Sequence, residues 1–408
     1  MRRRRSASLA PRRTILVLGL LTALGPLTVD LYVPALPALG SDLATTASAI
    51  QASLAGSTIG LAVGTLLVGP WSDRAGRRLP LLVSTAVHIV ASLLCAIAPN
   101  VEMLIAMRVV SGAAAAGGGV VAAAMVRDMY RGLPMMRLTA QLAVVSGSAP
   151  IVAPLLGSLL LTTFTWRGIF WWLAAYGLLV LVAAVLVVPE TLPRAARASG
   201  WRALSGGVRA VLRDGRFVLL MLIAAALWSA QFAFIAGSPF LFQERFGFTT
   251  LQFGLVYATT AAGFVGGAQL APRLGARFGV ERVLGVVCWV MAAAGVASTI
   301  TITAGSVYLA LVTLWIGVAA VGTAIPSARA LAMSRVDRHA GTAAALLGSF
   351  TFAAAGLVTP LAGVAAGPIG LSMGVVISVF AIVAAVLTTR LTVADDGAWD
   401  APPRSPTG

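Results

Sequence analysis

The sequence predicts an all-α integral membrane protein with twelve transmembrane helices in two six-helix bundles. Of its 408 residues, 59% are hydrophobic and 10% are charged, and the mean hydropathy is +0.95. These values lie outside the range of soluble domains. A helical span needs about 20 apolar residues. The apolar runs of this chain are separated by turns rich in glycine, proline and arginine, and they divide into twelve segments of that length.

The basic residues are distributed as in a membrane protein and not as in a nucleic-acid-binding protein. The chain has no lysine, and its formal charge of +16 comes from 29 arginines. Twenty-six of these arginines fall on one side of the predicted spans, and the exceptions are Arg108, Arg167 and Arg245. Arginine-rich loops stay in the cytoplasm. We therefore expect both termini to be cytoplasmic and exclude nucleic acid as a partner.

The connections between the apolar runs predict the organisation of the chain. The one long polar connection separates the two bundles, and residues 201–212 within it have the pattern of a short amphipathic helix at the membrane surface. The expected segments are a basic cytoplasmic N-terminus (1–13), a six-helix bundle (14–188), a cytoplasmic linker (189–215), a second six-helix bundle (216–390) and a disordered cytoplasmic tail (391–408).

A short repeat supports two related halves. The pattern R-x-G-x-R begins at Arg74 and again at Arg273, an offset of 199 residues. A six-helix unit used twice in parallel orientation is one of the known transporter architectures. The same offset places Asp30 on Ser229 and Arg108 on Val307. The intramembrane charges are therefore expected in the first half only.

Asp30 lies near the end of the first apolar run. A charge inside the bilayer costs at least about 2.5 kcal/mol, so such a residue has a functional role or a partner. One interpretation is that Asp30 carries the proton of a transporter. The other is that Asp30 lies at the membrane interface and simply ends the span.

Arg108 in the fourth apolar run is the expected partner of Asp30. With a helical rise of 1.5 Å per residue, Asp30 lies about 24 Å from the cytoplasmic edge and Arg108 about 10 Å from the outer edge of a core about 30 Å thick. The two are at the same level and can pair if their helices touch. In a transporter, Asp30 exchanges its proton when this contact loosens. In a static ion pair, Asp30→Asn instead impairs folding.

A few polar and aromatic residues within the spans are candidates for a substrate pocket. An apolar pocket with few hydrogen-bonding groups suits a flat amphiphilic molecule. Each residue has an alternative role in helix packing. The candidates are Tyr32, Met107, Gln141, Gln231, Phe234, Tyr257 and Trp315.

No catalytic motif competes with transport. The chain lacks H-E-x-x-H and a P-loop, and it has no acidic pair with metal-ligand spacing. Cys95 and Cys288 lie inside apolar runs, where cysteine acts as a small hydrophobic residue. We expect neither an enzyme nor a bound cofactor or metal.

The turn after the second apolar run carries the most specific resemblance. The residues that carry it are Gly69, Asp73, Arg74, Gly76, Arg77 and Arg78. They resemble the loop 2-3 signature of the major facilitator superfamily, G-x-x-x-D-R-x-G-R-[RK]. The resemblance implies that this loop latches the two halves on the cytoplasmic side. Asp73 is then expected at a helix N-terminus of the other half, where a negative charge is favourable.

Two further motifs point to drug:proton antiporters of that superfamily. Arg108 and Gly112 resemble the span 4 signature whose arginine is linked to proton transfer. The segment with Gly147, Pro150, Pro154 and Gly157 is similar to the span 5 antiporter motif, with Ala153 and Ser158 in place of two glycines.

The branch is indicated by Asp30 with Tyr32, Pro34 and Pro37, and by the later segments WRGIFWW and PETLP. These features are similar to the bicyclomycin and chloramphenicol resistance type, Bcr/CflA. The resemblance implies a monomeric multi-pass protein of the bacterial inner membrane that exports a small amphiphilic drug in exchange for protons by alternating access. The alternatives are an importer or facilitator of a metabolite on the same fold and, more remotely, a membrane-embedded enzyme or sensor.

Overall fold

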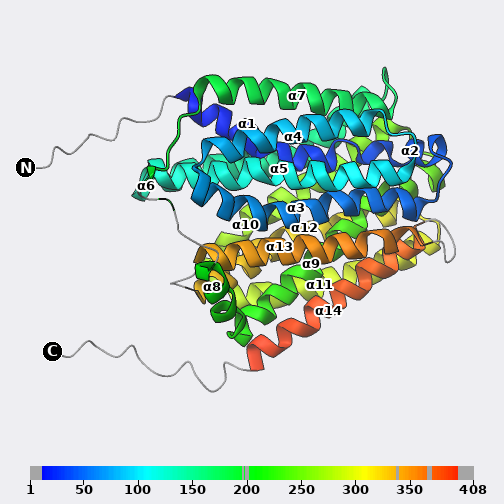
Figure 1. Ribbon diagram of the computed structural model, residues 1–408. Coiled ribbons are helices and arrows are strands. Elements are labelled where there is room, and N and C mark those ends of the chain that lie inside the picture. The colour runs from blue at the N-terminus through cyan, green and yellow to red at the C-terminus, as the bar shows by residue number, and fades with distance from the viewer. Residues whose placement is uncertain (1–11, 195–196, 198–201, 337–339, 365–369, 394–408) are drawn as a thin grey trace, which may run out of the picture.

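The structure is a computed structural model that describes residues 12–194, 197, 202–336, 340–364 and 370–393. The expected N-terminal segment up to residue 11 and the tail from residue 394 lie outside these ranges. The described part is all-helical, and its long helices run side by side (Figure 1). We refer to residues 12–194 as the first half and to residues 202–393 as the second half.

The first half contains seven α-helices and one short 3₁₀ segment. Polar caps begin two of its long helices: the Thr46 Oγ1 accepts a hydrogen bond from the Ala49 N–H, and the Asn100 Oδ1 accepts one from the Met103 N–H. The elements are α1 (Arg12–Asp30), η1 (Val33–Ala35), α2 (Leu36–Asp42), α3 (Ala47–Ala75), α4 (Arg78–Ala96), α5 (Val101–Met129), α6 (Gly132–Leu160) and α7 (Trp166–Val187).

The second half follows a similar order. Its first helix, α8, overlaps the amphipathic helix predicted at residues 201–212. The elements are α8 (Arg202–Leu212), α9 (Gly215–Pro239), the π-helix η3 (Phe240–Arg245), α10 (Thr250–Phe278), α11 (Val280–Thr303), α12 (Val307–Ser334), α13 (Ala340–Val358), the 3₁₀ segment η4 (Thr359–Gly363) and α14 (Leu371–Val393).

Eleven helices in the described part are long and apolar enough to cross a membrane. The first of these spans, residues 13–42, joins α1, η1 and α2. The eleven do not include α10, although the prediction of two six-helix bundles needs a span in this part of the chain. This helix has 29 residues, but glycine, threonine and glutamine make it less apolar than its neighbours. The number of twelve spans therefore stays a prediction.

The two ends of the bundle are distinct. The described chain begins at Arg12 and ends at Val393 at the same end, together with α8, whereas α2 lies at the opposite end (Figure 1). We call the former the arginine end and the latter the far end. The assignment of the arginine end to the cytoplasm stays a prediction from the charge distribution.

Candidate functional site

The first span breaks directly after Asp30. The N–H of Leu31 still bonds to the Leu27 carbonyl, and the chain then passes through a turn into η1. Pro34 and Pro37 follow this turn, and proline cannot donate the hydrogen bond that continues a helix. Irregular backbone at membrane depth is tolerated where it is packed in protein or lines a cavity. The break therefore places the Asp30 carboxylate at the surface of a cavity.

The cavity has a volume of about 290 Å³ and lies between the two halves. Asp30 contributes its carboxylate from the first half, and the wall also contains the polar side chains Ser146, Gln231 and Thr260 and the Tyr257 hydroxyl. Aromatic side chains of the second half form much of the remaining wall, namely Trp228, Phe232, Phe234, Tyr257, Phe264 and Phe352. Such a lining accommodates a flat apolar body with a few polar groups.

Asp30 contacts the second half through Tyr257. The Tyr257 hydroxyl donates to the Asp30 Oδ1 over 3.5 Å, the long limit of a hydrogen bond. Asp30 is 5% exposed. This contact joins α1 to α10 across the cavity wall.

Arg108 does not form the predicted ion pair. It is fully buried, its Nη2 donates to the Thr28 carbonyl at 2.8 Å, and its guanidinium carbon lies 4.0 Å from the centre of the Tyr32 ring. A cation over an aromatic face is attracted by the ring. No ion pair joins Asp30 to Arg108 among the described residues. The break turns Asp30 toward the cavity, while the α1 backbone and Tyr32 contact Arg108.

Three of the seven candidate substrate residues line the cavity: Gln231, Phe234 and Tyr257. Tyr32 and Met107 do not line it. Tyr32 is fully buried between Arg108 and Phe170, and its hydroxyl lies 3.2 Å from the Ser53 Oγ. Met107 packs against the hydrophobic core of the same region.

Gln141 and Trp315 also lie outside the cavity wall. Gln141 is exposed on the outside of α6. The Trp315 ring is 44% exposed, packs over Gly263, and donates its Nε1–H to the Thr259 carbonyl at 3.0 Å. Both residues were chosen because they are polar or aromatic within a span. Their helix face, which the tertiary packing sets, points them away from the cavity.

The antiporter motif lies on α6 between the two halves. Gly147 and Pro150 line the cavity. Gly157 lies so close to the break that a Cβ there would collide with the Leu31 carbonyl oxygen. The Pro154 carbonyl and Ser158 face Gly254 of α10 at short range. The motif therefore brings α6 against both the broken span and the second half.

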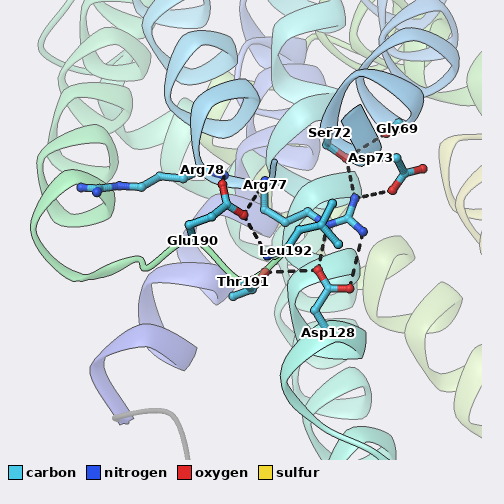
Figure 2. Close-up of polar contacts among 9 residues, drawn as sticks. All are labelled: Gly69, Ser72, Asp73, Arg77, Arg78, Asp128, Glu190, Thr191 and Leu192. Carbon is cyan, nitrogen blue, oxygen red and sulfur yellow. Dashed lines mark hydrogen bonds and ion pairs between the residues drawn. The ribbon is translucent and has the colours of Figure 1, made fainter. Parts of the chain in front are cut away.

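The predicted loop at residues 69–78 forms an ion cluster at the arginine end. Figure 2 shows the Arg77 guanidinium between Asp73, Asp128 and Ser72. The Arg77 Nε donates to the Asp128 Oδ2 at 2.8 Å and Nη1 donates to the Ser72 Oγ at 2.9 Å, while Asp73 also pairs with Nη1. The Asp128 Oδ2 further accepts the Thr191 hydroxyl at 3.2 Å. Burial disfavours the charge of Arg77, but the two carboxylates outweigh this effect and raise its pKa.

Glu190 ties the start of the linker to the same loop. Its carboxylate accepts the backbone N–H groups of Arg77 at 2.8 Å, Arg78 at 3.2 Å and Leu192 at 2.9 Å. Desolvation raises the pKa of Glu190, but these hydrogen bonds and the charge of Arg197 outweigh it and leave the pKa below its ordinary value. Gly76 has φ +95°, and a Cβ there would collide with Glu190.

The remaining loop residues have separate positions. The Ser72 hydroxyl donates to the Gly69 carbonyl at 2.8 Å, and the Arg78 Nη2 donates to the Val185 carbonyl at 2.7 Å, away from the cluster (Figure 2). Arg74 lies in the last turn of α3. Asp73 was expected at a helix N-terminus of the second half. In this conformation it pairs instead with Arg77 one helical turn away.

The sequence reasoning missed Asp128 and Glu190. Both are acidic residues beside arginines at the ends of apolar runs, and that sign was available in RDMYRGLP and PETLP. It also missed Trp228 and Phe352 in the cavity wall. Many aromatic residues lie in apolar spans, and nothing in the sequence distinguishes those that face a cavity. Among the described residues, no group of three His, Cys, Asp or Glu side chains is arranged to hold a metal ion.

Comparison with known proteins identifies relatives over nearly the whole chain. The model of the Major Facilitator Superfamily matches residues 18–360. An uncharacterised MFS-type transporter, YdgK of Bacillus subtilis, is 32% identical over 382 residues, which are 92% of this chain and 94% of the relative. A chloramphenicol resistance protein of Pseudomonas aeruginosa is 32% identical over 342 residues, 82% of this chain and 79% of the relative.

A bicyclomycin resistance protein homologue of Haemophilus influenzae is 27% identical over 383 residues, covering 90% of this chain and 94% of the relative. Among solved structures, a D-xylose-proton symporter superposes with a TM-score of 0.77 at 17% identity, covering 92% of this chain and 97% of that chain. At this identity the superposition shows the fold alone. The chain is a multi-pass inner-membrane protein that belongs to the Major Facilitator Superfamily and is similar to its chloramphenicol and bicyclomycin resistance members.

Proposed function

We propose that this protein exports a drug-like molecule in exchange for protons by alternating access. The observation that supports this most is the position of Asp30. Its carboxylate ends α1 at a helix break, lines an aromatic cavity between the halves and is not paired with Arg108. The names of the chloramphenicol and bicyclomycin resistance relatives support a drug as the substrate.

Asp30 is suited to carry the proton because its carboxylate has no guanidinium partner in this conformation. A carboxylate locked in an ion pair would stay ionised, whereas one at a cavity wall can gain and lose a proton as the cavity opens to each side. Arg108 keeps its own charge because arginine does not deprotonate in proteins. We therefore assign proton binding to Asp30. Arg108 supplies a permanent positive charge that contacts the α1 backbone at Thr28.

The contacts between the halves favour a conformation closed at the far end. The Gln51 Nε2 donates to the Ala236 carbonyl at 3.1 Å, and the Gln243 Nε2 donates to the Pro34 carbonyl at 3.0 Å. Gln51 lies near the start of α3, whereas the Arg77 cluster lies at the opposite end of that helix. If the arginine end is cytoplasmic, the cavity in this state is sealed from the outside.

The transport cycle follows from these positions. Substrate enters the cavity from the cytoplasm or the inner leaflet while Asp30 is deprotonated. The halves then rock, the far-end hydrogen bonds break, and protonation of Asp30 from outside displaces the substrate. In the outward-facing state Asp73 leaves Arg77 and meets a helix N-terminus of the second half, as the loop signature implies. Only a substrate or proton that binds the two states with different affinity can drive this change.

The experiment that tests this function measures transport of chloramphenicol and of a fluorescent cationic dye in inside-out vesicles, with and without an imposed pH gradient. Wild type is compared with Asp30→Asn at equal abundance. A matched control is Asp42→Asn, because Asp42 contacts Trp166 and Arg167 at the far end, outside this cavity. We expect gradient-driven transport in wild type and in the control, and its loss in Asp30→Asn.

A second candidate function is import or facilitated passage of a small metabolite. It is favoured by the superposition on a D-xylose-proton symporter. Facilitated passage predicts transport that ignores both the pH gradient and Asp30→Asn. Import coupled to protons predicts that a gradient drives substrate in the same direction as protons.

A further inference from the structure

Gln231 has a polar group that the protein itself does not use. It lies on α9 in the wall of the cavity, it is 8% exposed, and its Oε1 is buried with no hydrogen-bond partner in the described part of the chain. A buried amide without a partner has lost its hydrogen bonds to water and gained none. A ligand that enters the cavity can supply the missing partner.

Other glutamines near the interface of the halves have structural roles. The Gln51 amide donates to the Ala236 carbonyl, and the Gln252 side chain completes the cap of α10 with Thr249. Gln243 uses both ends of its amide, since Nε2 donates to Pro34 and Oε1 accepts the Thr250 hydroxyl. Gln231 differs from these three because its amide neither joins two elements nor caps a helix. Helix packing therefore does not account for its amide.

The surroundings of Gln231 define what a ligand would present to it. Trp228 and Phe234 flank it on α9, and Phe352 packs against Trp228 with ring centres 5.4 Å apart. These rings cover the apolar body of a substrate. In the described wall of second-half residues, the Thr260 hydroxyl already donates to the Tyr257 carbonyl at 2.8 Å, whereas the Gln231 Oε1 has no partner.

A smaller cavity of about 20 Å³ lies on the other side of Gln231, toward Ser298 and Thr313. It has room for about one water molecule. The hydroxyls of Ser298 and Thr313 already donate to backbone carbonyls of their own helices. A water held there by Gln231 is the rival explanation for the unpaired oxygen. It predicts a structural role that is the same for every substrate.

We infer that Gln231 selects substrates by hydrogen bonding, so that the cavity prefers aromatic amphiphiles that carry a hydroxyl, amino or amide group. This inference rests on the proposed function and specifies its substrate class. A site built to hydrogen-bond a substrate group discriminates strongly against an analogue without that group, because the site's own polar atom is then left unpaired. Asp30 attracts a positive charge but cannot make this distinction alone.

The test compares two aromatic cations in equilibrium binding to the purified full-length protein in lipid nanodiscs. Ethidium carries aromatic amino groups, whereas tetraphenylphosphonium has no N–H or O–H group. The variants are Gln231→Leu and Gln231→Met, which keep the apolar volume, and the control is Gln141→Leu on the outer face of α6. Melting temperatures establish that each variant is folded.

We expect both Gln231 variants to weaken ethidium binding by about tenfold or more and to change tetraphenylphosphonium binding by less than about twofold. Gln141→Leu should change neither. Equal losses for both cations would overturn the inference in favour of the water-holding role, and no loss for ethidium would overturn it as well. Binding of neither cation by wild type would also overturn it. Binding that discriminates without gradient-driven transport would overturn the proposed function alone.

Discussion

The helix pair α3 and α5 in the first half and the pair α10 and α12 in the second half have the same backbone design. An offset of 203 residues places both ends of α3 on the ends of α10, and an offset of 206 places Val101 on Val307. Gly64 approaches the Ala113 carbonyl as Gly267 approaches the Ala319 carbonyl, at the same two offsets. A glycine with positive φ follows each first helix, Gly76 and Gly279.

The charges do not follow this symmetry. In the first half the loop after α3 carries the Arg77 cluster, whereas in the second half Gly279 lies between Phe278 and Val280. The same register places Asp30 on Ala233, in the middle of the continuous helix α9, and Arg108 on Leu314. The break after Asp30 therefore has no counterpart at Ala233. The duplicated unit supplies the packing, whereas the intramembrane residues Asp30 and Arg108 have apolar counterparts in the second half.

This difference separates two kinds of constraint. Close glycine contacts hold a helix pair at short distance, and both halves need them for folding. Charged groups cost free energy in a membrane protein and do not improve packing, so one copy is sufficient when their role is to respond to protons or to conformation. Substitutions at matched positions in the two halves can test this separation.

The largest effect is expected at the shared glycines. In Gly64→Ala and Gly267→Ala the new Cβ would overlap a carbonyl oxygen of the partner helix, so each should lose about 3 kcal/mol or more of stability or fail to accumulate. Gly119→Ala and Gly266→Ala have open space around the new methyl group and are the controls. Melting temperatures of the purified proteins measure the effect. Loss in one half only would contradict the shared packing design.

A smaller loss is expected when Arg77 is removed. Arg77→Ala leaves Asp128, whose side chain is 18% exposed, without its charged partner and should cost roughly 2 kcal/mol. Arg78→Ala removes one hydrogen bond to the Val185 carbonyl and should cost less than about 1 kcal/mol. Val280 is the residue of the second half that corresponds to Arg77. Val280→Ala should cost as little as Arg78→Ala. Equal losses at Arg77 and Arg78 would show that the cluster contributes no more than surface hydrogen bonds.

Removal of the Glu190 charge should have a modest and pH-dependent effect. Because the pKa of folded Glu190 is lowered, its contribution to stability is fully present above the ordinary value of 4.5 and is lost as the pH falls through the lowered value. We expect Glu190→Gln to lower stability by no more than about 1 kcal/mol at neutral pH, because the side chain is exposed. Melting temperatures of wild type and variant should converge in acid. A constant difference at every pH would mean that the charge is not responsible.

The smallest effect is expected for Tyr257→Phe. The hydrogen bond from Tyr257 to Asp30 is 3.5 Å long, so its loss should change stability by less than about 1 kcal/mol and the transport rate by less than about threefold. Transport of chloramphenicol in inside-out vesicles measures this directly. A loss as complete as that expected for Asp30→Asn would place Tyr257 in the path of the proton.

The sequence predicted two related halves, and matched helices occur in both. The predicted offset of 199 residues between them was wrong, because the helices match at an offset of 203. The pattern R-x-G-x-R aligned Gly76 with Gly275, but Gly275 lies inside α10 and the turn occurs at Gly279. Arg74 therefore corresponds to Arg277, and Asp30 to Ala233 in place of Ser229. A short motif of arginine and glycine recurs by chance in cytoplasmic turns. The glycines that correspond are the ones with positive φ directly after the matched helices, Gly76 and Gly279. Their positions depend on where each helix ends.

The sequence by itself determined the membrane class and the family, and it gave the hypothesis that Asp30 binds the proton. These follow from local properties: hydropathy, proline and glycine positions, and the cost of a charge among apolar neighbours. The same locality explains why residues 69–78 and the α6 motif could be proposed as sites from the sequence.

Only the tertiary structure decided which groups meet. It separated Asp30 from Arg108, placed the Arg77 cluster within the first half, and assigned Gln231, Phe234 and Tyr257, but not Trp315 or Gln141, to the cavity wall. The direction of a side chain on a helix depends on the rotation of that helix against its neighbours. In a chain whose spans are apolar on every face, hydrophobic periodicity does not specify that rotation, and the close contacts of glycines and prolines do.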